Sequence, residues 1–358
     1  PMRVHHRRFR RRGDAADAQT DARPPLLEHH LADRFHRAYA PAYHIFAEVQ
    51  VRVPDFAPRS LLDFGAGASP AGWAARAFWP DSSPRAILVE PNGEMRSLNS
   101  QLIGAALGNE SDDAMVVAEK MPDESAGTYD LVVAVNSLHE LPPEAVRTGT
   151  SLLLQRTSPG GLLCVVAPAT HGGFDTIMAA RAECIASVEA SIVAPCPHSA
   201  RCPLAAGGEM QRWHGRKHPR PLDTICHTTT SVIESSASAW KHRKRRRGGT
   251  RVTHSEAFVY LVARRREAKA EAEEAAEWSR IVREPRPRKG HVGVDLCTAE
   301  GHVASVTATQ RKSSAACYRF ARKSRMGMTW PFDSEHLNDA GGADDENEYE
   351  YFEYDDLE

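Results

Sequence analysis

Four of the seven cysteines lie in segments where their thiols can do chemistry together. Cys196 and Cys202 stand in the polar stretch APCPHSARCPL, whose prolines fix their own φ angles and favour extended backbone before them. Two further cysteines, Cys226 and Cys297, follow at longer distances along the chain. Thiolate sulfurs are good ligands for zinc and for iron–sulfur clusters. We therefore expect these four cysteines to form one metal site.

The spacing of these cysteines bears on which metal they would hold. Structural zinc sites usually use cysteine pairs with about two to four residues between them, and no pair here is that close. The long, irregular spacing favours a [4Fe–4S] cluster, with zinc as the alternative. If the metal is zinc, His198 or His227 can replace one thiolate. Cys164 lies in an apolar strand and is expected in the core, whereas Cys184 and Cys317 lie on predicted helices and are left out of the site.

A second set of residues has the pattern of a nucleotide-type cofactor site. In SLLDFGAG an apolar strand ends in Asp63 and continues into a turn with Gly65 and Gly67, where the backbone can approach a ligand closely. Glu90 ends the next strand, and an acidic residue there suits hydrogen bonds to a ribose diol. These four residues fit the S-adenosylmethionine site of class I methyltransferases. Asn136, at the end of the fourth strand, is expected at the same edge.

Residues that would carry out methyl transfer are not recognisable, so the catalytic residues stay unknown. Enzymes that methylate a base nitrogen often carry N/D-P-P-Y/F after the fourth strand, but the chain reads NSLH from Asn136 to His139. Enzymes that methylate cytosine carbon use a cysteine there, and none is present. The third glycine of the cofactor loop is replaced by Ser69-Pro70. The cofactor site is therefore better preserved than any catalytic site.

The elements that must position these residues follow an α/β pattern. Apolar strands alternate with helices, which predicts a mostly parallel, doubly wound sheet of the class I, Rossmann-like methyltransferase type. The first five strands are expected around 60–64, 86–89, 115–118, 129–135 and 162–167. Ligands of such sheets bind outside the carboxyl ends of the strands. Asp63, Glu90, Glu119 and Asn136 are therefore expected along one edge.

Changes of composition divide the chain into five segments. Apolar positions at helical spacing between 29 and 53 predict two short helices interrupted at Pro41. Strands around 256–264, 291–296 and 302–308 follow the cysteine-rich region, the last two as a hairpin, with a charged helix between the first two of them. We expect a basic leader and lead-in helices at 1–58, a methyltransferase-like core at 59–190, a cysteine-rich, metal-binding and basic insertion at 191–250, the last sheet strand or strands with a small β-containing C-terminal extension at 251–330, and an acidic tail at 331–358.

Charge is unevenly distributed, although the formal net charge is only -2. Basic runs often contact nucleic acid, and phosphate contacts of this kind weaken with salt. No stretch of eighteen apolar residues occurs, which speaks against a membrane span. The basic opening PMRVHHRRFRRR is similar to part of a mitochondrial targeting peptide, with an RNA-binding arm as the alternative. Candidate RNA contacts are 241–247, 283–289, Arg319, Arg322, Lys323 and Arg325.

The chain resembles the mitochondrial methyltransferase-like proteins of the small ribosomal subunit, from about Tyr39 to Pro331. The motifs that carry the resemblance are LLDFGAGASPAGWAA, APCPHSARCPL, a later C-H, EAFVYLVARR, RIVREPRPRKGHVGVDLC, and RFARKSR followed by WP. The resemblance implies a class I methyltransferase fold, the mitochondrial matrix, and a role in small-subunit assembly with rRNA, ribosomal proteins and other assembly factors as partners. It also implies a four-cysteine iron–sulfur site, which maps onto Cys196, Cys202, Cys226 and Cys297.

We therefore expect an assembly factor that binds rRNA and ribosomal proteins and in which the cluster is structural. The alternative is an active S-adenosylmethionine-dependent rRNA methyltransferase. A third hypothesis is a zinc-stabilised RNA-binding protein. Two departures from the family pattern bear on the surroundings of the cluster: Thr228 replaces an aromatic residue after the C-H pair, and the segment before Trp330 reads GMT.

Overall fold

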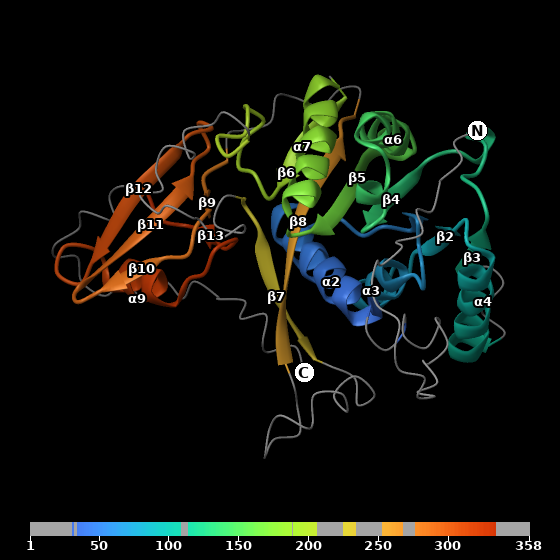
Figure 1. The fold of residues 1–358 in the computed structure, drawn as a ribbon, viewed down its shortest axis with the longest axis horizontal. Coiled ribbons are helices and arrows are strands. Elements are labelled where there is room, and N and C mark those ends of the chain that lie inside the picture. Colours follow the sequence, from blue (N-terminus) through green and yellow to red (C-terminus); the bar gives the residue numbers. More distant parts are fainter. Residues whose placement is uncertain are drawn as a thin grey trace, which may run out of the picture.

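The computed structural model of the protein describes Leu31 and residues 34–108, 114–187, 189–205, 225–233, 253–267 and 276–333. Within these residues the chain forms two β-sheets, and Figure 1 shows the smaller one at one end of the long axis. The larger sheet contains β1 (Ser60–Phe64), β2 (Arg85–Val89), β3 (Met115–Ala118), β4 (Tyr129–Val135), β5 (Thr157–Pro168), β6 (Ala190–Ala194), β7 (Thr228–Ile233) and β8 (Thr253–Arg265).

The larger sheet has the strand order of a class I methyltransferase fold. Its strands run in the order β3-β2-β1-β4-β5-β8-β6, and β7 pairs with β8. Strands β1 to β5 are parallel, whereas β8 is antiparallel to both β5 and β6. The predicted doubly wound α/β fold is confirmed. From the described part of the segment expected as the cysteine-rich insertion, β6 and β7 add strands to this sheet.

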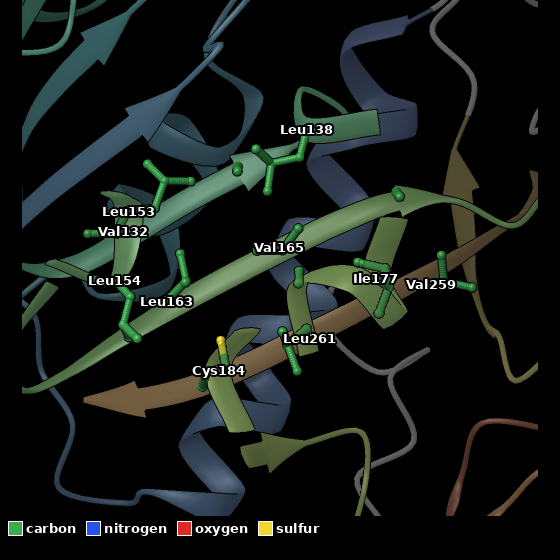
Figure 2. Packing of buried hydrophobic residues seen from close by; sticks show 14 of the residues in the cluster. Val132, Leu138, Leu153, Leu154, Leu163, Val165, Ile177, Cys184, Val259 and Leu261 are labelled. Carbon is green, nitrogen blue, oxygen red and sulfur yellow. The ribbon is translucent and has the colours of Figure 1, made fainter. Parts of the chain in front are cut away.

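Helices cover both faces of this sheet, because successive side chains of each strand point to opposite faces. Leu61, Val133 and Cys164 join the core beneath α2 (Phe35–Arg52) and α3 (Pro70–Phe78). On the other face lie α6 (Pro143–Gln155) and α7 (His171–Ala186). Figure 2 shows that face: Leu153 of α6 and Ile177 of α7 belong to one buried cluster with Val165 and Leu261 of the sheet. A further helix, α4 (Gly93–Leu107), contacts β3.

One predicted break is absent. The two short helices expected on either side of Pro41 form the single helix α2, with Pro41 buried inside it. A proline in a helix removes one backbone hydrogen bond and crowds the preceding turn. The buried face of α2, which includes Ile45, Phe46 and Val49, packs against α3 and the sheet. This burial outweighs the local cost of the proline and keeps the helix continuous.

The smaller sheet is built by the C-terminal extension. It contains β9 (Ser279–Ile281), β10 (Arg286–Arg288), β11 (His291–Cys297), β12 (Val303–Thr309) and β13 (Thr329–Trp330). The expected hairpin is confirmed, because β11 and β12 pair along their whole length. Helix α9 (Ala315–Lys323) packs on β11 and β12, and Trp330 is buried against Phe320. The charged helix expected before this sheet lies partly outside the described residues, and its end at Ser279–Ile281 is the strand β9.

Candidate functional site

The glycine turn after β1 takes the conformation that its sequence predicts. Gly65 and Gly67 have φ angles of 72° and 56°, values that favour glycine. The backbone N–H groups of Gly65 and Ala66 both donate to the carbonyl of Val89, so the turn is fastened to the end of β2. A Cβ atom on Gly65 would lie 2.4 Å from the Cβ atom of Ser137, which places the ends of β1 and β4 side by side.

Glu90 is buried at the end of β2, where its carboxylate holds the turn. One oxygen accepts a hydrogen bond from the Gly67 N–H at 2.8 Å, and the other accepts one from the Asn92 N–H at 2.8 Å. The side chain of Asn99 donates to the Gly67 carbonyl at 2.6 Å. The structure therefore brings the predicted cofactor residues of β1 and β2 together. Both carboxylate oxygens of Glu90 are already used within the chain.

Asp63 is a buried acid next to this turn, and Ser69 is its hydrogen-bond partner. The Ser69 hydroxyl donates to Asp63 at 3.0 Å, and Ser69 has a left-handed φ of 53° directly before α3. A serine therefore stands in the conformation usual for glycine, and its side chain holds the acid. Burial, aided by the nearby charge of Glu90, raises the pKa of Asp63 to about 7. Near neutral pH this carboxyl is poised between its charged and neutral forms.

The remaining polar residues of this edge are spread out. Asn136 ends β4 with a φ of 54°, and its backbone N–H donates to the Val166 carbonyl at 2.9 Å. Glu119 is exposed and lies 3.5 Å from Arg96 of α4. His139 belongs to a short 3-10 turn, and burial lowers its pKa. The described part of this edge thus shows a binding turn, and no acid–base pair marks a catalytic site within it.

Strand β8 brings two of the predicted metal ligands together. Its C-terminal half pairs with β6 as far as Val262, and its N-terminal half pairs with β7 from Phe258. The end of β6 and the start of β7 thus meet along one edge of β8. Cys196 follows β6 by two residues and Cys226 precedes β7 by two. The two cysteines are therefore anchored close together by one strand.

The other two predicted ligands reach the same place from different directions. Cys202 lies in the loop that leaves Cys196, and Cys297 ends β11 of the smaller sheet. Burial raises the pKa of Cys297, and the nearness of the other three thiols raises it further. Burial likewise raises the pKa of Cys226 to about 12, with help from Cys196 and Cys202. The structure thus gathers the four predicted thiols where the two sheets meet. We call these four residues the cysteine junction.

The cysteine junction holds a buried positive charge that the described residues leave uncompensated. Arg181 of α7 is only 3% exposed, and its Nε has no hydrogen-bond partner. Its Nη2 donates to the carbonyl of His198 at 2.7 Å. Burial raises the pKa of Cys202 and of Cys297. The charge of Arg181 opposes this shift in both cases, as a smaller influence. A buried cation needs an anion nearby. A thiolate centre with net negative charge fits this surrounding.

Within the described ranges, no three or more His, Cys, Asp or Glu side chains are arranged so that they could hold a metal ion. The two histidines named as alternative ligands lie at the junction in different ways. His198 Nε2 is 3.2 Å from Cys297 Sγ. His227 is buried, and its Nδ1 lies 3.4 Å from the carbonyl of Ile225.

A second buried arginine joins the parts around the cysteine junction. Arg280 of β9 donates to Glu48 of α2 at 2.7 Å, to the Pro195 carbonyl at 2.8 Å and to the Gly327 carbonyl at 2.8 Å. Burial alone would raise the pKa of Glu48, but Arg280 and Arg52 lower it to about 2. Sequence reasoning missed this ion pair, because its partners are 232 residues apart and stand in no recognisable motif.

Basic side chains gather on the smaller sheet. Arg319, Arg322, Lys323 and Arg325, on or just after α9, are exposed. Other predicted contacts are engaged within the chain, since Arg286 binds Asp295 through two hydrogen bonds of 2.6 and 2.9 Å and Arg283 lies 3.6 Å from the same carboxylate. The basic run 241–247 lies outside the described residues. No described helix combines the length and the apolarity that crossing a membrane requires.

Solved structures with similar folds include two methyltransferases. The precorrin-6y C5,15-methyltransferase of Geobacter metallireducens has a TM-score of 0.36 and 13% identity, and the match covers 63% of this chain and 87% of that one. The magnesium protoporphyrin IX methyltransferase of Synechocystis also has a TM-score of 0.36 and 13% identity, with 70% and 86% covered. The fold assignment above is based on the strand order.

Curated relatives are mitochondrial proteins. The human ribosome assembly protein METTL17 is 27% identical over 312 residues, which cover 84% of this chain and 62% of the human protein. The Saccharomyces cerevisiae ribosome assembly protein RSM22 is 27% identical over 180 residues, or 39% of this chain and 28% of the yeast protein. The chain spans less than two thirds of the length of these relatives. The family model described as mitochondrial small ribosomal subunit Rsm22 matches residues 28–331, and the chain therefore belongs to this family.

Proposed function

We propose that the protein is an assembly factor of the small mitochondrial ribosomal subunit that works in the matrix and binds rRNA, ribosomal proteins and other assembly factors. Membership of the Rsm22 family and the names of the human and yeast relatives support this role. The observation that carries the proposal is the cysteine junction, because it ties a methyltransferase-like sheet to a smaller sheet with a basic helix. The fold then serves as a scaffold.

A metal centre at this junction is part of the proposal. Cys196, Cys202, Cys226 and Cys297 would hold a [4Fe–4S] cluster, with zinc as the alternative. When bound, the centre supplies metal–sulfur bonds that cross-link the insertion and both sheets. The buried charge of Arg181 favours the ionised thiolates.

RNA contact is assigned to the exposed cations of the smaller sheet. Arg319 and Arg322 lie on α9, and Arg325 follows it. Arginine and lysine side chains neutralise backbone phosphates and release counterions, so binding should weaken steeply as salt is raised. Arg286 is a weaker candidate, because Asp295 already takes both of its terminal nitrogens.

Methyl-donor binding is the second candidate function, favoured by the turn after β1. Asp63, Gly65, Gly67, Glu90 and Asn136 would hold S-adenosylmethionine, with the cofactor's ammonium group near Asp63 and its ribose at Glu90. A cation beside Asp63 would lower the raised pKa of this acid. The contacts from Glu90 to Gly67 and Asn92 would have to open for a ribose to bind. Transfer of the methyl group has no side chain assigned to it.

The first experiment measures iron, sulfide and zinc in protein purified without oxygen. We expect about four irons per chain, lost in Cys226→Ser and retained in Cys317→Ser, since Cys317 lies on α9 and is buried in the core of the smaller sheet. One zinc per chain would replace the cluster by a zinc centre. If neither metal is bound, the metal centre is excluded.

The second experiment separates the scaffold from the enzyme in cells. Cys196→Ser and Glu90→Ala variants are compared for the amount of assembled small subunit in sedimentation profiles. Loss of assembly in Cys196→Ser alone supports the scaffold. Loss in Glu90→Ala, together with loss of a methyl mark on the rRNA, would overturn it in favour of the methyltransferase.

A further inference from the structure

His198 occupies a special place in the cysteine junction. It lies between Cys196 and Cys202 in the chain, but its ring turns toward the smaller sheet, where Nε2 is 3.2 Å from Cys297 Sγ. The side chain is buried, and the turn of the β11–β12 hairpin packs on it: a Cβ atom on Gly301 would lie 3.4 Å from His198 Nδ1. The His198 ring therefore lies between Cys297 and the hairpin turn, which keeps Nε2 in contact with the sulfur.

Arg181 favours one of the two tautomers of the His198 ring. Its Nη2 lies 3.4 Å from His198 Nδ1 while it donates to the His198 carbonyl at 2.7 Å. A guanidinium group only donates hydrogen bonds, so Nδ1 can bond to Arg181 only as an acceptor, which favours the neutral tautomer with its proton on Nε2. The carbonyl of Ala200 is a second group near the ring. A proton on Nδ1 directed toward Ala200 would also face the N–H groups of Arg181, which disfavours that tautomer.

The contact of Nε2 with Cys297 also favours a proton on Nε2. A cysteine binds metal as a thiolate, which has no proton to donate. The contact between Nε2 and Cys297 Sγ is therefore a hydrogen bond from the ring N–H to the sulfur. A nitrogen that carries a proton in this direction has no lone pair for a metal. His198 is thereby removed from the possible ligands of the centre.

We propose that His198, oriented by Arg181, is a positioning residue that donates a hydrogen bond to the ligating sulfur of Cys297 and so sets the reduction potential and the persistence of the metal centre. The inference rests on the proposed metal centre and goes beyond it. Hydrogen bonds to ligand sulfurs are among the features that tune cluster potentials. By withdrawing electron density, this bond stabilises the more negative, reduced form. It also makes the sulfur harder to protonate, which slows loss of the metal.

The test compares four proteins: wild type, His198→Leu, His198→Gln and His302→Leu. Leucine removes the donor, whereas the glutamine amide can restore an N–H group near the position of Nε2. His302 is an exposed histidine of the neighbouring hairpin whose Nδ1 lies 3.2 Å from the Thr298 hydroxyl, so it serves as the matched control. The measurements are the midpoint potential in a titration with a chemical reductant and the rate at which a chelator bleaches the visible absorption of the cluster.

We expect His198→Leu to bind iron, to have a more negative midpoint potential than wild type and to lose its cluster several times faster. His198→Gln should return both quantities toward wild type, and His302→Leu should match wild type. Arg181→Leu should resemble His198→Leu, because the ring then loses its orientation. Thermal melting of the metal-free proteins shows whether a variant has also lost its fold.

The outcomes separate this inference from the metal centre itself. If wild type binds iron and His198→Leu keeps the same potential and the same rate of loss, the inference is overturned and the centre stands. If the protein binds zinc, the rate of zinc transfer to a chelator is compared across the same variants, and equal rates overturn the inference. If wild type binds neither metal, both proposals fall. If His198→Leu fails to bind metal and His198→Gln does not restore binding, His198 is a ligand and the inference is wrong.

Discussion

The turn after β1 and the cysteine junction both contain buried polar groups, but these groups are hydrogen-bonded to different extents. At the turn after β1, Glu90 uses one oxygen for Gly67 and the other for Asn92, and Ser69 holds Asp63. At the cysteine junction, the thiols raise one another's pKa. There Arg181 also has a buried nitrogen without a partner.

The difference indicates what each place needs. Unsatisfied buried groups are costly, and a chain tolerates them where another group completes the site. The turn is closed by its own hydrogen bonds and holds its shape without a ligand. The junction has thiols that raise one another's pKa and a buried cation with an unpartnered nitrogen, which are the features that the proposed metal centre would satisfy. The four predictions that follow test this contrast, in order of decreasing effect.

Replacing Arg280 by methionine should do the most damage, because it takes a buried cation out of the joint between α2, the cysteine loop and the smaller sheet. Glu48 would keep only Arg52 at 2.9 Å, and the carbonyls of Pro195 and Gly327 would lose their donor. Breaking a buried ion pair in this way costs about 4 kcal/mol. Urea-induced unfolding at neutral pH measures the loss.

The matched control for this prediction is the exposed pair of Arg37 and Glu256, whose charged atoms lie 3.7 Å apart. Arg37→Ala should cost less than about 1 kcal/mol, as exposed ion pairs do. If Arg280→Met unfolds at the same urea concentration as this control, Arg280 does not hold the joint. Arg280→Lys, which keeps the charge but not the fork of donors, should fall between the two.

The Asp63→Asn variant examines the turn through pH. Because the pKa of Asp63 is about 7 in the folded protein and 3.8 for an unperturbed aspartic acid, folding favours the protonated acid. Its contribution to stability is present below about pH 4 and is lost as pH rises through 7. Asparagine cannot ionise, so the variant should be more stable than wild type above pH 7. The gain is about 3 kcal/mol, after about 1 kcal/mol is subtracted for a weaker bond to Ser69.

Free energies of unfolding at pH 5 and pH 8 check the sign. The difference between the variant and wild type should grow with pH. An equal or shrinking difference would mean that Asp63 is ionised at neutral pH without a ligand, and the turn would then resemble the junction in needing a counterion.

Gly65 and Gly67 form a matched pair for alanine substitution. Both have positive φ, which costs an L-residue about 1 kcal/mol. Only at Gly65 would the new Cβ atom collide with Ser137, at 2.4 Å, whereas a Cβ atom on Gly67 would meet no heavy atom within 4 Å. Gly65→Ala should therefore cost about 2–3 kcal/mol, and Gly67→Ala about 1 kcal/mol. Equal costs in urea unfolding would show that β1 and β4 are not packed this tightly.

The smallest effect is expected from Glu90→Gln. The amide keeps one acceptor and turns its NH₂ group toward a backbone N–H, so one of the two hydrogen bonds is lost, at about 1 kcal/mol. Calorimetric titration with S-adenosylmethionine adds a second measurement. If the turn binds the methyl donor through its ribose, the variant should bind it at least ten times more weakly than wild type does. Unchanged affinity would remove Glu90 from that site.

Much of the larger sheet was predictable because its signals are local. Strands β3 and β4 lie where the apolar runs predicted them, at Met115–Ala118 and Tyr129–Val135. Strand β7 was missed because TTTSVI is short and mostly polar. The unbroken α2 was also missed, because its continuity depends on packing that the sequence around Pro41 does not reveal.

The candidate sites were predictable in composition and less so in their surroundings. Residue type and spacing named the four thiols and the glycine turn. They did not reveal that Glu90 binds the turn itself, that Arg181 reaches the carbonyl of His198, or that Arg280 binds Glu48. These contacts join residues that meet only after the strands are paired, so no periodicity or motif records them.

The position of Cys297 in the smaller sheet has a consequence for the order of synthesis. The first three cysteines of the junction are synthesised before the fourth, because Cys297 follows Cys226 by some seventy residues. At typical rates of translation the three thiols wait on the order of 10 s for the fourth. A centre that needs all four can close only on a chain whose C-terminal hairpin has been made and folded. The metal content of a preparation would then report the fraction of chains that contain the folded hairpin with Cys297, because shorter chains could not bind the metal.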